Sequence, residues 1–314
     1  MKKAFFLIIG LLMVLVLLDL TQFSTDVQLL SLLVPDFRLP RLLAVLGAGF
    51  ALSLSGLILQ SLTKNPLADG GTLGLTSGAS FGAVAFLLIL SKLHLTGFWS
   101  HAYPLFALLG SLLAFFLIYI FALKRQLSNT RLLLTGIALT ALFQALITMG
   151  QLSINSFDFQ QVATWLSGDV WQSDWAYLGL VYALLLIALA VYPFYLKRLE
   201  VLNLGDELAL SLGLDLQRTK FQLYLLATAF AMIGVLLVGG LGFVGLIAPH
   251  IAGELTGFKL RAKSLMAGLV GMLILVFADL LSQLLIYPSS LPIGFLVAFI
   301  GAPYYIYLIQ KKLS

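Results

Sequence analysis

The chain has 314 residues, of which 61% are hydrophobic and only 10% are charged, and its formal net charge is +5. Because a soluble globular domain has about a quarter charged residues, this composition excludes an ordinary soluble protein and indicates one surrounded mostly by lipid. The absence of cysteine excludes disulfides, cysteine-ligated zinc and iron–sulfur clusters. No polar segment combines clustered basic residues with aromatics, so the positive charge does not indicate nucleic-acid binding.

The first apolar run follows Lys2 and Lys3 and continues to about residue 22. It is long for a signal peptide, and no convincing small-residue cleavage site precedes Thr25. We therefore predict a retained first span with its lysines in the cytoplasm.

Apolar runs separated by charges or turn signals predict an all-α polytopic membrane protein with ten transmembrane helices in a single domain, 1–314. The short eighth run predicts that the chain turns inside the membrane at residues 239–242, which is tolerable where the turn is buried in protein. The predicted limits are approximately 4–22, 42–62, 74–91, 103–123, 131–151, 175–196, 221–239, 242–257, 264–286 and 293–310.

Positive charge tests this count, because cytoplasmic loops carry an excess of lysine and arginine. With ten spans and both termini cytoplasmic, 15 basic residues fall inside and 3 outside, which together account for all 18. The outer three are Arg38, Arg41 and Lys92. A missed or extra span would destroy this asymmetry.

The second span, between Leu42 and Leu62, contains no charged residue. Its length of about 21 residues gives roughly 30 Å of helix, which matches the bilayer core. Small residues recur along it, and they allow close approach of neighbouring helices. These residues are Gly47, Gly49, Ser53 and Gly56. With the Asn-Pro break at residue 65 and the small-residue segment 72–79, the pattern predicts a tightly packed membrane hairpin.

A polar stripe runs along the fifth span. Thr140, Gln144, Thr148 and Gln151 follow one another at offsets of four, four and three, which places them on one helical face. An unpaired amide is costly in lipid, so this face is expected to meet protein or water. Two interpretations stay open: contact between helices, or the wall of a path for a substrate.

The inner segment 197–220 predicts a short amphipathic helix on the membrane surface. Asp206 and Glu207 fit its first turn, where the positive end of the helix dipole favours acidic residues. Leu208 and its neighbours 210 and 212 supply apolar side chains, and Gly213 is placed to end the helix.

Asp279 is the clearest ionisable residue deep in a span, which makes it a functional candidate by default. A proton relay would need further ionisable groups, and only His250 and Glu254 lie at comparable depth. We favour a structural role, with Asp279 hydrogen-bonded to neighbouring helices.

The sequence contains none of the common nucleotide-binding or catalytic motifs. It has no phosphate-binding G-x-x-x-x-G-K-[ST] loop, no H-E-x-x-H, no G-x-S-x-G and no paired carboxylates in a span. We predict no catalytic residue, no metal site and no cofactor in this chain. If transport is driven by ATP, another chain must hydrolyse it.

Five motifs carry a resemblance to a known family. R-L-P-R-x-L begins at Arg38, S-G-L-I-L-Q at Ser55 and N-P-L-A-D at Asn65. G-F-V-G-L-I-A-P-H-I begins at Gly242 and L-P-I-G-F-L-V-A-F-I-G-A-P at Leu291. In this order and spacing they resemble the permease subunits of the ATP-binding-cassette (ABC) importers for iron–siderophore complexes, haem and cobalamin. The resemblance covers residues from about 38 to 308.

The resemblance implies an inner-membrane permease that imports an iron chelate, either a siderophore complex or haem, with cobalamin as the alternative substrate. An ion-coupled secondary transporter is the alternative from another class. The implied partners are a second permease, identical or paralogous, two ATPase subunits that carry ATP and Mg²⁺, and an external substrate-binding protein. Spans two to five and seven to ten would form an inverted repeat.

The same resemblance assigns roles to residues. The spacing E-x-A-x-x-x-G resembles the motif that couples importer permeases to their ATPase, and the implied coupling residues are Gly205, Asp206, Glu207, Leu208, Ala209 and Gly213. At the outer face, Arg38 and Arg41 match arginines that pair with acidic residues of the binding protein, whereas Gln283 stands where some relatives have a third arginine. The fifth span would line the translocation path.

Overall fold

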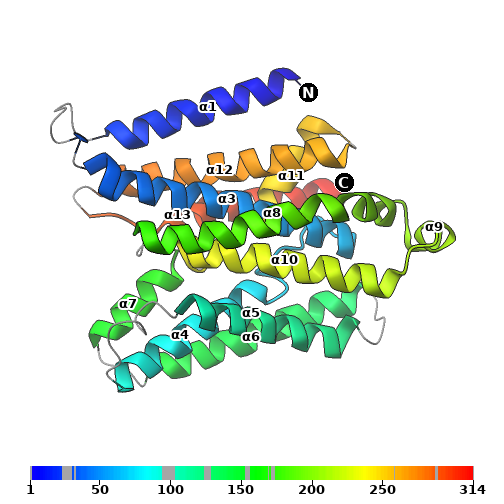
Figure 1. Cartoon of the computed structure of the whole chain (residues 1–314), viewed down its shortest axis with the longest axis horizontal. Coiled ribbons are helices and arrows are strands. Elements are labelled where there is room, and N and C mark those ends of the chain that lie inside the picture. Colours follow the sequence, from blue (N-terminus) through cyan, green and yellow to red (C-terminus); the bar gives the residue numbers. More distant parts are fainter. Residues whose placement is uncertain are drawn as a thin grey trace.

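The computed structural model describes residues 2–22, 30–31, 33–93, 103–123, 129–152, 156–168, 170, 174–257, 259–286 and 289–313. Within these ranges the regular elements are helices and no strand occurs. The longer helices run side by side in one bundle (Figure 1). Both labelled termini and the short helix α9 lie at one end of this bundle, and the short helix α7 lies at the other. The all-α prediction is confirmed.

The chain before the middle of the sequence forms α1 (Lys2–Thr21), α3 (Leu39–Thr63), α4 (Leu75–Leu93), α5 (Tyr103–Ile118) and α6 (Asn129–Gln151). One turn of π-helix precedes α3 (η1, Val34–Arg38) and another follows α5 (η3, Tyr119–Leu123). The remaining helices are α7 (Ser156–Leu166), α8 (Trp175–Asn203), α9 (Asp206–Ser211), α10 (Leu216–Val238), α11 (Val244–Thr256), α12 (Leu260–Leu285) and α13 (Ile293–Leu313).

A helix lies at each of the ten predicted apolar segments. Among the described residues, seven helices are long and apolar enough to cross a membrane, whereas α11 has 13 residues. The number of crossings and the side on which each terminus lies therefore stay predictions. Lys124 and Arg125, which the charge rule places inside, lie outside the described residues.

Two helices extend beyond the apolar runs that predicted them. Polar residues extend α8 at its C-terminal end and α10 at its N-terminal end. Helix α8 continues to Asn203, past the predicted limit of 196. Helix α10 begins at Leu216, since the Asp215 carboxylate accepts a hydrogen bond from the Arg218 backbone N–H (3.0 Å) and caps its first turn. The loop that carries α9 is correspondingly short.

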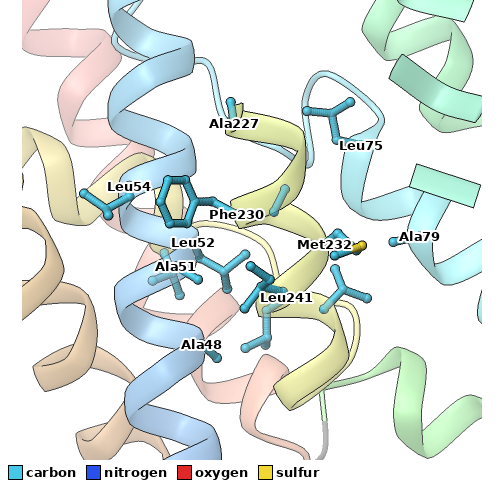
Figure 2. Close-up of a cluster of buried hydrophobic side chains, with 14 of the residues drawn as sticks. Ala48, Ala51, Leu52, Leu54, Leu75, Ala79, Ala227, Phe230, Met232 and Leu241 are labelled. Carbon is cyan, nitrogen blue, oxygen red and sulfur yellow. The ribbon is translucent and has the colours of Figure 1, made fainter. Parts of the chain in front are cut away.

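Helix α3 lies at the centre of the bundle and packs against α8, α10, α11 and α12. It is buried along most of its length, whereas α1 is largely exposed. Figure 2 shows Leu52 of α3 pointing toward α10, and Phe230 of α10 reaching back toward α3. The predicted close approach along the small residues of α3 is confirmed: Gly49 lies against the backbone of Gly271, and a Cβ atom there would overlap it. The predicted hairpin of α3 with α4 is wrong, because α4 packs mainly against α5, α6 and α10.

The chain between α10 and α11 turns at its glycines, and the position of this turn inside the membrane stays a prediction. Gly239 ends α10 with a φ of 73°, a conformation that favours glycine. Helix α11 starts soon afterwards, and its Gly245 lies against Leu52 and Gly56 in the C-terminal half of α3. Gly239 and Leu241 are buried, whereas Gly242 is exposed, so the turn lies partly within the bundle and partly at its surface.

Candidate coupling, docking and pathway sites

Helix α9 is a six-residue helix set between two glycines. Gly205 has a φ of 120° and Gly213 a φ of 81°, so both need the conformational freedom of glycine. After the last turn, the N–H of Leu214 donates to the Ala209 carbonyl at 3.0 Å and the N–H of Gly213 to that of Leu210 at 2.9 Å. These bonds end the helix where the sequence predicts.

Helix α9 turns an apolar surface outward. Leu208, Leu210 and Leu212 are 55%, 57% and 66% exposed, and Glu207 beside them is also exposed. Ala209 is fully buried, so the middle of the E-x-A-x-x-x-G spacing faces the bundle. The three leucines form an exposed apolar knob outside the long helices, and such a surface is suited to contact another protein.

Asp206, the first residue of α9, faces two lysines. Its carboxylate accepts hydrogen bonds from Lys220 Nζ at 2.7 Å and from Lys64 Nζ at 3.3 Å. Partial burial raises the pKa of Asp206, but the two ammonium groups outweigh that effect and hold the pKa below its usual range. The carboxylate is therefore charged at neutral pH and joined to the bundle.

The C-terminal ends of α1 and α12 and the N-terminal end of α3 meet in a polar cluster. Arg41 pairs with Asp279, whose side chain is 1% exposed, and Gln283 Nε2 donates to Asp279 at 3.1 Å and to Asp19 at 3.2 Å. The prediction that Asp279 is hydrogen-bonded to a neighbouring helix is confirmed. Asp19 is a partner that the sequence analysis missed, although an aspartate near the end of an apolar run signals such a contact.

Arg38 also has a partner within the chain, because its Nη1 donates to the Leu20 carbonyl at 2.6 Å. Arg38 and Arg41 are both half-buried, and Arg41 keeps 22% of its side chain exposed. The structure thus brings the three predicted docking residues, Arg38, Arg41 and Gln283, to one end of the bundle. Docking of a binding protein there stays a prediction.

The predicted polar stripe divides into two parts. Thr140 Oγ1 donates to the Gly71 and Gly136 carbonyls, both at 3.0 Å, so this hydroxyl joins α6 to the loop before α4. Gln144 and Thr148 lie on the exposed side of α6, and Thr148 Oγ1 donates to the Gln144 carbonyl at 2.9 Å. Contact with another segment is thus shown for Thr140, whereas a pathway role of Gln144 and Thr148 stays a prediction.

A comparison with known families decides the identity. The model of the FecCD transport family matches residues 4–311. The chain belongs to this family. It is a multi-pass membrane protein, as the seven long apolar helices also require.

Curated relatives of this FecCD-family chain are transport permeases. It is 38% identical over 281 residues to the iron(3+)-hydroxamate import system permease protein FhuG of Bacillus subtilis, covering 88% of this chain and 83% of that protein. It is 34% identical to the iron-uptake system permease protein FeuC of the same species, covering 99% and 98%. It is 39% identical to the vitamin B12 import system permease protein BtuC of Klebsiella pneumoniae, covering 90% and 83%.

A solved structure shares the fold of this FecCD-family chain. It is described as a metal-chelate type ABC transporter in an inward-facing conformation, with a TM-score of 0.86 and 26% identity. That match covers 99% of this chain and 100% of the other.

The FecCD-family signature around Pro249 contains a contact that the sequence analysis missed. Proline has no N–H, so Pro249 leaves the Gly245 carbonyl without its usual helical donor. Gln60 of α3 supplies one, because its Nε2 donates to the carbonyls of Gly245 at 3.2 Å and Leu246 at 3.1 Å. A proline in an apolar helix with a distant buried glutamine is the only sequence signal of this pair.

Among the described residues, no three histidine or acidic side chains gather in a group that could hold a metal ion.

Proposed function

We propose that this FecCD-family chain is the membrane-spanning permease subunit of an ABC importer that takes up an iron chelate. The observation that carries the proposal is α9, whose leucines form an exposed apolar surface on a chain that matches a transport family over residues 4–311.

An iron–siderophore complex is the favoured substrate. The relatives named above include permeases for iron(3+)-hydroxamate and for iron uptake. Cobalamin is the alternative, because the Klebsiella relative is a vitamin B12 permease at similar identity. Haem, which the sequence analysis included, has no support among these relatives.

The proposed assembly pairs this chain with a second permease and two ATPase subunits, which bind ATP and Mg²⁺ and dock on α9. An external binding protein delivers the chelate to the end of the bundle that carries Arg38 and Arg41. The chelate then passes along the exposed face of α6 that carries Gln144 and Thr148. A neutral polar stripe suits a bulky substrate, because it offers hydrogen bonds without a fixed charge.

Reconstitution tests the proposal. The permease is co-purified with a candidate ABC-importer ATPase from the same genome, placed in liposomes and supplied with a candidate binding protein. We expect uptake of radiolabelled ferric hydroxamate that needs ATP and exceeds uptake of cobalamin. Uptake that follows an ion gradient and needs no ATPase would instead identify a secondary transporter and refute the proposal.

A further inference from the structure

Helix α9 is attached to the bundle by few side chains. Ala209 is its one fully buried residue, and its leucines face outward. Within the described part of the chain, the side-chain hydrogen bonds that join α9 to other helices are those made by Asp206. A movement of α9 can therefore be transmitted to the bundle through the chain on either side of α9 and through the Asp206 carboxylate.

The two lysines that hold Asp206 come from different helices. Lys220 lies near the start of α10, and its Nζ is 2.7 Å from Oδ2. Lys64 caps the end of α3 in a left-handed conformation, with a φ of 50°, and its Nζ is 3.3 Å from Oδ1. Each carboxylate oxygen thus has its own ammonium partner, on a separate helix.

These two helices are central to the bundle. Helices α3 and α10 pack closely against each other along the core that Figure 2 shows. Helix α3 also contacts α11 and α12 through glycines, where backbones touch and movement of one helix must displace the other. A displacement of the Lys64 end of α3 therefore affects the centre of the molecule.

The ion pairs are too exposed to be needed for folding. The side chains of Asp206 and Lys64 are 42% and 45% exposed, and that of Lys220 is 26% exposed. Exposed pairs of this kind contribute little to stability. The Lys220 contact, at 2.7 Å, has the short length of a charge-assisted hydrogen bond, whereas the Lys64 contact is longer, at 3.3 Å. A role in positioning fits these facts better than a role in holding the fold.

We propose that Asp206 is a positioning residue that transmits movement of α9 to α3 and α10 through Lys64 and Lys220. The proposal rests on the proposed function, since it requires an ATPase that docks on α9. It differs from the expectation that Asp206 itself touches the ATPase, because the carboxylate is engaged by its own chain. It also gives a role to two lysines that otherwise serve only as cytoplasmic charge.

The test measures transport per ATP hydrolysed in the reconstituted importer. Asp206→Asn, Lys64→Gln and Lys220→Gln should each leave ATPase binding and ATP hydrolysis unchanged while lowering uptake per ATP by about two- to fivefold, the range that an exposed ion pair supplies. Arg218→Gln is the matched control: it removes a cation two residues before Lys220 that forms no ion pair with Asp206 in the structure. This control should leave ATPase binding, ATP hydrolysis and uptake per ATP unchanged.

A charge-reversed variant separates transmission from direct contact with the ATPase. The triple variant Asp206→Lys, Lys64→Asp, Lys220→Asp rebuilds the three-group contact with opposite signs and should recover much of the lost coupling. If this variant does not fold, the double variant Asp206→Asn, Lys220→Gln replaces it, and its loss should be smaller than the product of the single losses.

Three results would overturn the proposal. Unchanged uptake per ATP in Asp206→Asn would show that the carboxylate transmits nothing. Weaker ATPase binding in Asp206→Asn, with no recovery in the charge-reversed variant, would show that Asp206 contacts the ATPase instead. Multiplicative losses in the double variant would show that the two residues act separately. Failure of the unmodified permease to bind any ATPase would refute the proposed function itself, which is a distinguishable outcome.

Discussion

Arg41 and Asp279 join α3 to α12 across 238 residues of sequence, with three hydrogen bonds from one guanidinium to one carboxylate. Arg41 Nε lies 3.1 Å and 3.2 Å from the two carboxylate oxygens, and Nη2 lies 2.8 Å from Oδ1. The carboxylate is buried, whereas the arginine reaches partly into solvent. An acidic group on a docking protein would therefore compete with Asp279 for Arg41.

The unequal burial of this pair predicts unequal costs of removing each partner. Arg41→Met leaves a carboxylate buried without its counter-charge and should lower the free energy of unfolding by about 3–5 kcal/mol. Asp279→Asn leaves an arginine that can turn toward solvent, and it should cost roughly 1–3 kcal/mol. Thermal unfolding of the purified permease gives both values. Equal costs, or a greater cost for Asp279→Asn, would contradict this account of the pair.

Arg38 provides a cleaner test of docking than Arg41. Arg38→Glu leaves the Arg41–Asp279 pair intact, whereas a charge reversal at Arg41 would place two carboxylates together. Because electrostatic attraction mainly sets association rates, Arg38→Glu should slow association with the binding protein and reduce its dependence on salt. Surface plasmon resonance at several salt concentrations measures both. An unchanged rate and an unchanged salt slope would remove Arg38 from the docking surface.

The Gln60 contact predicts coupling between Gln60 and Pro249. Gln60→Leu removes a donor to the buried Gly245 carbonyl and should cost about 1–3 kcal/mol. In a Pro249→Ala background, the restored N–H at residue 249 can bond to that carbonyl, so Gln60→Leu should cost about 0.5–1.5 kcal/mol less. A double-mutant cycle of thermal unfolding measures the difference. Additive costs would show that Gln60 does not replace the missing donor.

Gly56 should tolerate no side chain. A Cβ atom at Gly56 would overlap the carbonyl of Gly245, so Gly56→Ala must push α11 away from α3. We expect a loss of about 1–3 kcal/mol or failure to fold, because backbone atoms cannot move aside. Gly10→Ala in α1 is the control, since nothing lies within 4 Å of a Cβ there, and it should be neutral or stabilising. Equal expression and melting temperature of the two variants would refute the close contact.

The charge of Asp206 should make coupling insensitive to pH near neutrality. Its pKa is lowered from the ordinary value of 3.8 in the folded protein, so the contribution of its ion pairs is complete above that value and lost only as pH falls through the lowered pKa. Uptake per ATP should therefore be constant between about pH 5 and 8. An Asp206-dependent fall in coupling within that window, absent in Asp206→Asn, would show that the carboxylate titrates higher.

The sequence by itself determined the helices and the small-residue faces. Apolar length specifies a membrane helix, and the glycines at 205 and 213 specify the limits of α9, because both signals act over a few neighbouring residues. The family motifs are equally local, and they identified the chain before any contact was known.

Only the tertiary structure decided which polar groups meet. Lys64 and Asp206 are 142 residues apart, and Gln60 and Gly245 are 185 residues apart. No periodicity within one helix records such a pairing. Helices of similar apolar character can pack in many ways, and the glycine contacts of α3 select the arrangement that brings these groups within hydrogen-bond distance. The physical reason is that apolar burial is non-directional, whereas a buried hydrogen bond needs two specific atoms in place.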